Sequence, residues 1–167
     1  MSALDQTKDS LLRQIGATLL LLQELERLMT DTLKHASNRS LSVAQLNQLD
    51  RRTMGALAAT LRQRVELSDT FAADLAAFIS DRNIFIHSLS AQPWFDWRSV
   101  SGQLALIEFL RSLHRRGEEA IKIFLGYLVS ASDENGTKPE HYTEPGKRAF
   151  VSELHQDYLH ELKPRAS

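Results

Sequence analysis

The segment 81–89, which reads DRNIFIHSL, places an arginine, an asparagine and a histidine in a run that is otherwise rich in large apolar residues. A guanidinium keeps its proton, so a buried Arg82 needs an acidic partner, a bound phosphate or a route to solvent. Asn83 and His87 are four residues apart and would touch on a helix. These side chains therefore decide between a chemical site that takes a phosphate and an ordinary helical core.

An ideal α-helix keeps Arg82 and His87 on different faces. The two residues are five positions apart, which places their side chains about 140° apart around the helix axis. Arg82 instead belongs to an apolar stripe whose members are three and four residues apart. The other members of this stripe are Leu75, Phe78, Phe85 and Leu89. A long arginine side chain or a local distortion of the helix could bring Arg82 and His87 to one cleft.

The composition is that of a single globular domain. Of the 167 residues, 43% are hydrophobic and 25% are charged, which is enough to bury a core without cross-links. The 20 basic and 21 acidic side chains nearly cancel, so the chain lacks the strongly basic surface of a protein that holds duplex DNA through its phosphates. Cysteine is absent, which excludes disulfides and thiolate metal sites and fits a reducing compartment.

Neither a secretory signal nor a membrane span is predicted. The first ten residues carry acidic side chains and no apolar segment. The most apolar run, 19–22, is far short of the ~20 residues that a membrane span needs. We therefore expect a cytoplasmic protein with no membrane partner.

Apolar residues recur at helical spacing and show no β alternation, which predicts an all-α fold. We expect a bundle of four helices over about 4–34, 42–66, 68–90 and 96–130. Ser42 can cap the second helix, and Pro93 cannot continue the third. The third helix carries the stripe that contains Arg82.

Residues 1–132 should form this bundle, and residues 133–167 a linker and a short additional C-terminal helix. The segment 133–146 gathers Asn, Gly and Pro, which are typical of a loop. The last helix, over about 147–162, would be amphipathic. Its apolar face would consist of Val151, Leu154, Tyr158 and Leu162. We expect that face to pack on the bundle or on a partner subunit.

The hexapeptide RNIFIH, residues 82–87, resembles the Arg-Asn-x-x-x-His version of the R-x(4–6)-H motif of HEPN domains. The segment RTMGALAATL, residues 52–61, resembles a Thr-Leu-Gly-x-x-Leu-like stretch found one helix before that motif in bacterial members. The similarity covers roughly residues 5–130. It implies a bundle of about four helices, with the motif near the end of the third.

The resemblance implies a metal-independent endoribonuclease that acts as a homodimer, with the motifs of two subunits facing each other across one composite site. His87 would act as the general acid/base on the ribose 2′-hydroxyl or on the leaving oxygen. Arg82 would hold the scissile phosphate, and Asn83 would orient the phosphate or His87. The family also implies a toxin or defence effector, neutralised by a companion antitoxin. No cofactor and no metal are expected.

A different class of protein fits the same residues. Arg82 could form a structural ion pair with a neighbouring helix, and His87 could lie at the edge of a core, which would make the chain a non-catalytic helical interaction module. The spacing alone does not decide, because an arginine followed by a histidine recurs at Arg148 and His155.

Three other groups of residues are predicted to be structural. The histidines at 35, 114, 141, 155 and 160 lack the spacing of a zinc site, and His114 should lie at a core edge. Arg111, Arg115 and Arg116 form a basic cluster that is expected to be a solvated face, with contact to RNA backbone as the alternative. The cluster of Trp94, Phe95 and Trp97 should lock a turn onto the bundle, with stacking on a base as the alternative.

Overall fold

The structure, a computed structural model, describes residues 3–36, 53–134 and 161–164. Along the chain these residues form helix α1 (Ala3–Ala36), helix α3 (Met54–Arg64), strand β1 (Val65–Leu67), helix α4 (Asp69–Asn83), helix α5 (Val100–Glu134) and strand β2 (Leu162–Pro164). A π-helical turn (Ile84–Ser88) and a 3₁₀ turn (Leu89–Ala91) extend α4 toward α5. The all-α prediction is confirmed.

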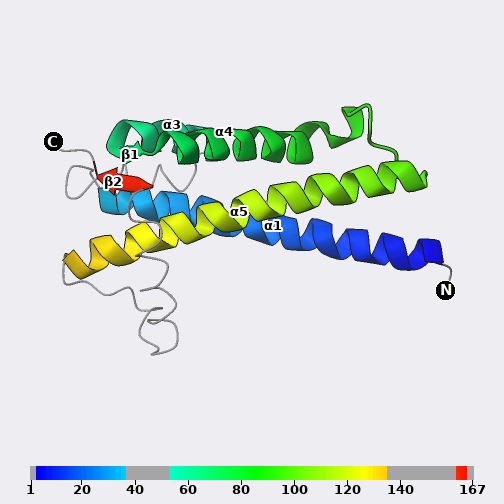
Figure 1. Ribbon diagram of the computed structural model, residues 1–167, viewed down its shortest axis with the longest axis horizontal. Helices are drawn as coiled ribbons and strands as arrows, with labels where there is room; N and C mark the ends of the chain where they lie inside the picture. The colour runs from blue at the N-terminus through cyan, green and yellow to red at the C-terminus, as the bar shows by residue number, and fades with distance from the viewer. Residues whose placement is uncertain (1–2, 37–52, 135–160, 165–167) are drawn as a thin grey trace.

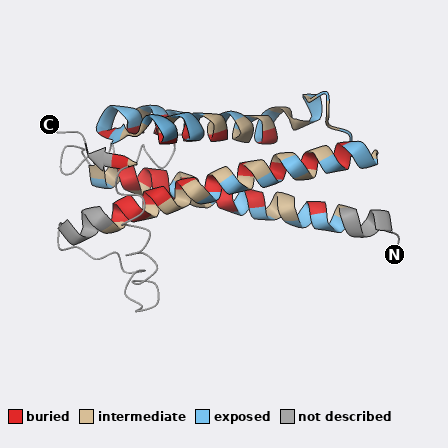
Figure 2. Cartoon of the chain, viewed as in Figure 1, coloured by how far each residue is buried: buried red, intermediate tan, exposed pale blue. Residues whose placement is uncertain are grey.

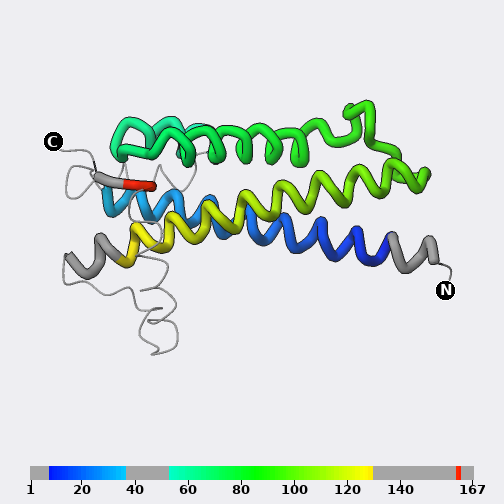
Figure 3. The backbone as a smooth tube through the Cα atoms, in the orientation of Figure 1, coloured from blue at the N-terminus to red at the C-terminus, as the bar shows by residue number. Residues whose placement is uncertain are grey.

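The two long helices, α1 and α5, lie side by side and run in the same direction (Figures 1 and 3). Helix α4 runs in the opposite direction along α5. Helix α3 packs against α1 near the C-terminal end of α1. The candidate residues of α4 thus lie in a layer that covers the α1–α5 pair.

The core follows the interior of these helices (Figure 2). Its largest fully buried side chains come from all of them and include Leu25, Leu28, Met29, Leu61, Phe78 and Phe124. Side chains of two helices pack directly over Gly117 of α5. A Cβ atom placed there would overlap the Leu21 side chain and lie 2.9 Å from Cε2 of Phe78. A larger residue at this position would therefore require Leu21 of α1 and Phe78 of α4 to shift.

The first predicted helix is confirmed, whereas the second is not continuous through Thr53 and ends before residue 66. Helix α3 starts at Met54, because Thr53 has an extended backbone and its hydroxyl accepts a hydrogen bond from the backbone N–H of Ala56. It ends at Arg64, and the next three residues form a strand rather than a helix. The predicted cap Ser42 lies outside the described residues.

Strand β1 pairs with β2 in an antiparallel register that sets Val65 opposite Pro164 and Leu67 opposite Leu162. The prediction that the last helix reaches residue 162 is wrong, because Leu162 lies in β2, is buried and joins the core. Residues 147–160 lie outside the described residues. The strand at 162–164 nevertheless fixes this part of the chain to the start of α4, where the backbone N–H of Ser68 donates to the carbonyl of Glu161 over 3.0 Å.

The turn before α5 is held by its own side chains. Helix α5 starts four residues later than predicted, because the Ser99 hydroxyl accepts from the backbone N–H of Gly102 over 3.0 Å and so caps it. The buried amide of Gln103 donates to the carbonyl of Trp97 over 3.0 Å.

The same turn lowers the pKa of Asp96. Its carboxylate accepts hydrogen bonds from the backbone N–H of Arg98 and, with a smaller effect, from the Ser99 side chain.

The aromatic cluster packs on the core, as expected of residues that lock a turn. Trp94, Phe95 and Trp97 are partly buried against it. The ring centroids of Trp94 and Phe109 are 5.2 Å apart. None of the described helices is both long and apolar enough to cross a membrane.

Candidate functional site

Helix α4 presents the predicted stripe to the core. Ser68 caps the helix, since its hydroxyl accepts a hydrogen bond of 3.0 Å from the backbone N–H of Phe71. Leu75 and Phe78 are buried, as is Phe85 in the turn that follows. Arg82 continues this stripe, and only 17% of its side chain is exposed. The sequence thus placed Arg82 correctly at the margin of the core.

The π-helical turn Ile84–Ser88 brings Arg82 and His87 together. In such a turn the backbone bonds link residues five apart, so residues five apart come to face each other as residues four apart do in an α-helix. Arg82 Nη1 lies 3.4 Å from His87 Nε2 and donates to Asn83 Oδ1 over 3.2 Å. The three predicted site residues therefore form one cluster, and the turn is the local distortion that this requires.

The contact defines how His87 is oriented. A guanidinium only donates hydrogen bonds, so this contact favours the tautomer in which Nε2 of His87 accepts and the ring proton is on Nδ1. At 3.4 Å this bond is long and therefore weak. Asn83 and His87 are both exposed. The imidazole of His87 is thus accessible from solvent, and its Nε2 becomes an open acceptor when Arg82 moves to another partner.

Glu26 of α1 belongs to the same cluster and was not among the predicted site residues. Its Oε1 accepts a hydrogen bond of 3.1 Å from Arg82 Nη2, across 56 positions of the chain. The sequence contains a feature that could have identified Glu26 as a partner of Arg82. Glu26 interrupts the apolar line of the first helix between Leu22 and Met29, just as Arg82 interrupts the stripe of α4.

The pairing of Arg82 is incomplete. Its Nε is buried and has no hydrogen-bond partner among the described residues. The side chain of Glu26 is 35% exposed, so this pair lies at the edge of the interior rather than inside it. The cluster therefore holds a cation whose donors are only partly used, beside an imidazole and a primary amide.

A second ion pair flanks the cluster. Asp81, which precedes Arg82, accepts a hydrogen bond from Arg116 of α5. Arg116 therefore does not belong to a uniformly solvated basic face, which corrects that part of the prediction. Arg111 and Arg115 are exposed, as predicted. Arg148 and His155 lie outside the described residues.

This arrangement can bind an oxyanion and exchange a proton beside it. Among residues 3–36, 53–134 and 161–164, no three His, Asp or Glu side chains form a group that could hold a metal ion. Comparisons with protein-family models, with curated proteins and with solved structures gave no match for this chain. The assignment of a function therefore rests on the cluster itself and on the sequence motif.

A double-mutant cycle measures how much the Arg82–Glu26 pair stabilises the fold. We expect Arg82→Met, Glu26→Gln and the double variant to give a coupling energy of about 1 kcal/mol in urea unfolding, because the pair is partly exposed and screened. Methionine keeps the apolar stem of the arginine. Arg116→Met with Asp81→Asn is the matched cycle, because these side chains are similarly exposed, at 30% and 24%. A coupling of ~3 kcal/mol or more would instead identify Arg82 as a buried structural ion.

Proposed function

We propose that this protein is a HEPN-type metal-independent endoribonuclease. The observation that carries the proposal is the meeting of Arg82, Asn83 and His87 at the surface through a π-helical turn. Such turns occur frequently at functional sites, because they cost regular backbone bonding and need a compensating advantage. The resemblance of residues 82–87 to the R-x(4–6)-H motif supplies the class of reaction.

The chemistry follows from the three side chains. Once Arg82 turns to the phosphate, the lone pair of His87 Nε2 is released and accepts the proton of a ribose 2′-hydroxyl, whose oxygen then attacks the adjacent phosphorus. Arg82 donates to the phosphate oxygens, which gain charge as the pentacoordinate phosphorane forms. The bond from phosphorus to the 5′-oxygen breaks, and this oxygen takes the proton that His87 has accepted, which restores the imidazole. The products are a 2′,3′-cyclic phosphate and a 5′-hydroxyl end.

Glu26 occupies one of the guanidinium donors that a phosphate would use. A carboxylate and a phosphate both accept from an arginine fork, so they compete for Arg82. We propose that substrate displaces Glu26 in part, and that Glu26 holds the guanidinium in place beforehand.

We further propose that the active form is a homodimer whose interface surrounds the cluster. Leu12 and Leu19 precede Glu26 at seven-residue intervals and so lie on the same strip of α1. They are large apolar side chains, yet 57% and 41% exposed. Ile86, next to His87, is 40% exposed. An apolar rim of this kind around a polar site is typical of a surface that a second subunit covers.

The biological setting proposed here rests on the resemblance alone. Such a domain implies a toxin or defence effector in the cytoplasm. Its substrate would be single-stranded RNA, and a companion antitoxin or regulator protein would control it. The nearly balanced charge of the chain means that RNA affinity would depend on local cations such as Arg82.

The second candidate is a non-catalytic helical interaction module. The contact between Arg82 and Glu26 is the observation that favours it, because an ion pair between neighbouring helices is what a structural Arg82 would form. The two candidates differ in the role of His87. The nuclease needs its imidazole for proton transfer, whereas the interaction module assigns this exposed side chain no function.

Cleavage of a mixed-sequence single-stranded RNA in excess EDTA tests the nuclease. We expect His87→Ala to lower the rate by roughly 10²- to 10⁴-fold, because it removes the proton acceptor. Arg82→Lys should lower it by about 10-fold or more, because lysine lacks the planar fork. The products are read by mass spectrometry as cyclic phosphates.

His35→Ala is the matched control, because His35 is an exposed histidine of α1 outside the cluster. It should cleave like the wild type. Equal cleavage by His87→Ala and the wild type would reveal a contaminating nuclease and remove the proposal. If no protein cleaves and Arg82→Met also unfolds early, the interaction module is the better account.

Replacing Glu26 by glutamine tests the competition for Arg82. We expect Glu26→Gln to lower the KM for RNA by about 3- to 10-fold with little change in kcat, because the competing carboxylate is gone. Glu24→Gln removes the same charge from the same helix and should leave KM within about twofold. An unchanged KM for Glu26→Gln would show that Glu26 and the phosphate do not share Arg82.

Light scattering over a concentration series tests the dimer. We expect Leu19→Glu to raise the dimer dissociation constant by about 10-fold or more, because it places a charge in an apolar interface. Leu20→Glu is the matched control, since Leu20 is 68% exposed but lies about 100° away around the helix. Equal effects of the two variants, or a monomeric wild type, would place the interface elsewhere or remove it.

A further inference from the structure

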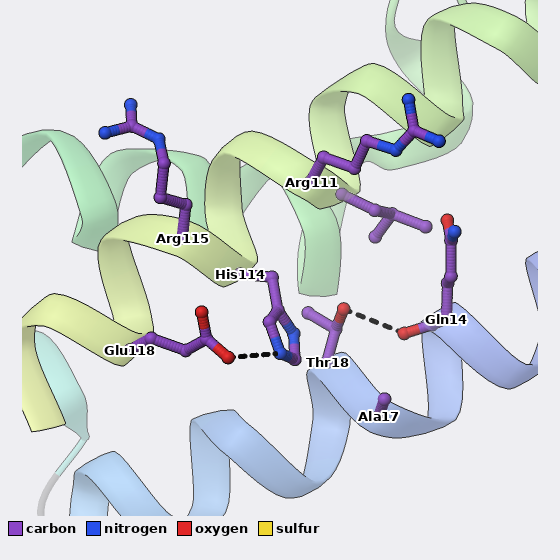
Figure 4. Close-up of a pocket in the computed structure, with 8 residues that line it drawn as sticks. Gln14, Ala17, Thr18, Arg111, His114, Arg115 and Glu118 are labelled. Atoms are coloured by element: carbon purple, nitrogen blue, oxygen red, sulfur yellow. Dashed lines mark hydrogen bonds and ion pairs between the residues drawn. The ribbon is translucent and has the colours of Figure 1, made fainter.

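A concave feature, the α1–α5 groove, lies between the two long helices. Its walls are Gln14, Ala17 and Thr18 of α1, and Leu110, Arg111 and His114 of α5 (Figure 4). The groove has a volume of about 310 Å³, which is within the range of small-molecule sites. It is separate from the Arg82 cluster, because Ala17 and Glu26 are nine positions apart and so lie about 180° apart around α1.

The interior of the groove is mostly apolar. Leu110 and Thr18 form its floor, and each is only 1% exposed. Ala17 contributes a single methyl group at the position where a larger side chain would fill the space. An apolar body of modest size therefore fits between the helices.

Gln14 places an unused acceptor in this apolar wall. Its Oε1 is buried and has no hydrogen-bond partner among the described residues. Thr18 does not satisfy it, because the threonine hydroxyl donates to the backbone carbonyl of Gln14 over 2.8 Å. A buried acceptor without a donor is unusual and costly, so a donor from a bound molecule would be favourable here.

The rim of the groove carries positive charge. Arg111 and Arg115 have no ion-pair partner among residues 3–36, 53–134 and 161–164. Glu118 is the opposing acid, and its carboxylate lies 3.4 Å from Nε2 of His114. Figure 4 shows the guanidinium of Arg111 on the side of the groove where Gln14 rises from α1, whereas Arg115 points away from α1. An anion is therefore favoured near Arg111.

We propose that the α1–α5 groove binds a small organic anion that combines an apolar body, one hydrogen-bond donor and an acidic group. The apolar body lies on Leu110 and Ala17, the donor pairs with Gln14 Oε1 when this buried amide turns into the groove, and the acidic group pairs with Arg111. This site does not depend on the ribonuclease proposal, because it uses none of the residues of the Arg82 cluster.

The dye 8-anilinonaphthalene-1-sulfonate has all three features and serves as the probe. We expect calorimetry and dye fluorescence to show one equivalent bound to the wild type. N-phenyl-1-naphthylamine lacks the sulfonate, and 8-phenoxynaphthalene-1-sulfonate has an ether oxygen in place of the N–H. Each should bind about 10-fold more weakly, because each loses one polar contact. Equal affinity of the three compounds would overturn the proposal.

Variants of the full chain locate the dye. Ala17→Leu fills the groove at an exposed position and should weaken binding by about 10-fold or more. Arg111→Gln should weaken it by about 3- to 10-fold, whereas Arg13→Gln, the same charge change on α1 outside the groove, should not. Circular dichroism checks that each variant is folded. If Leu20→Ser reduces binding and Ala17→Leu does not, the dye lies on exposed leucines and the groove is not a site.

Discussion

The close approach of three helices at Gly117 is the constraint on which both candidate sites depend. The absence of a side chain there lets Leu21 of α1 and Phe78 of α4 converge on α5. Arg82 lies one turn beyond Phe78, and Glu26 lies five positions beyond Leu21. The groove residues Thr18 and His114 lie three positions before Leu21 and Gly117, respectively. A larger residue at 117 would have to displace the Leu21 and Phe78 side chains and would so disturb the packing beside both sites.

The environment of Arg82 explains why structure and catalysis are hard to separate at this cluster. An arginine at the edge of a core must be compensated. A single carboxylate compensates it only in part, because the Nε donor has no hydrogen-bond partner among the described residues. The same partial pairing leaves donors that a phosphate can use. A preorganised guanidinium is thus held by the fold and remains available to a ligand.

The two candidate sites differ in how their cations are paired. In the Arg82 cluster the cation is bound by a carboxylate from another helix, so a ligand has to compete for it. At the α1–α5 groove Arg111 has no ion-pair partner among the described residues, and the buried group left unsatisfied is a neutral amide oxygen. An anionic ligand at the groove would therefore displace water rather than a protein side chain.

The sequence alone determined the helical class, the start of α4 and the position of Arg82 on an apolar stripe, because these depend on local spacing and capping. Glu26 was predictable in principle, since an acid interrupts one apolar line where a base interrupts another. The tertiary structure decided the rest. Strand β1 forms because residues 162–164, almost a hundred positions later, supply its partner. The π-helical turn leaves no local signature in IFIHS, because its cost is offset by packing and by contacts between helices rather than by propensity. The groove likewise exists only because α1 and α5 lie parallel with Ala17 facing the gap between them.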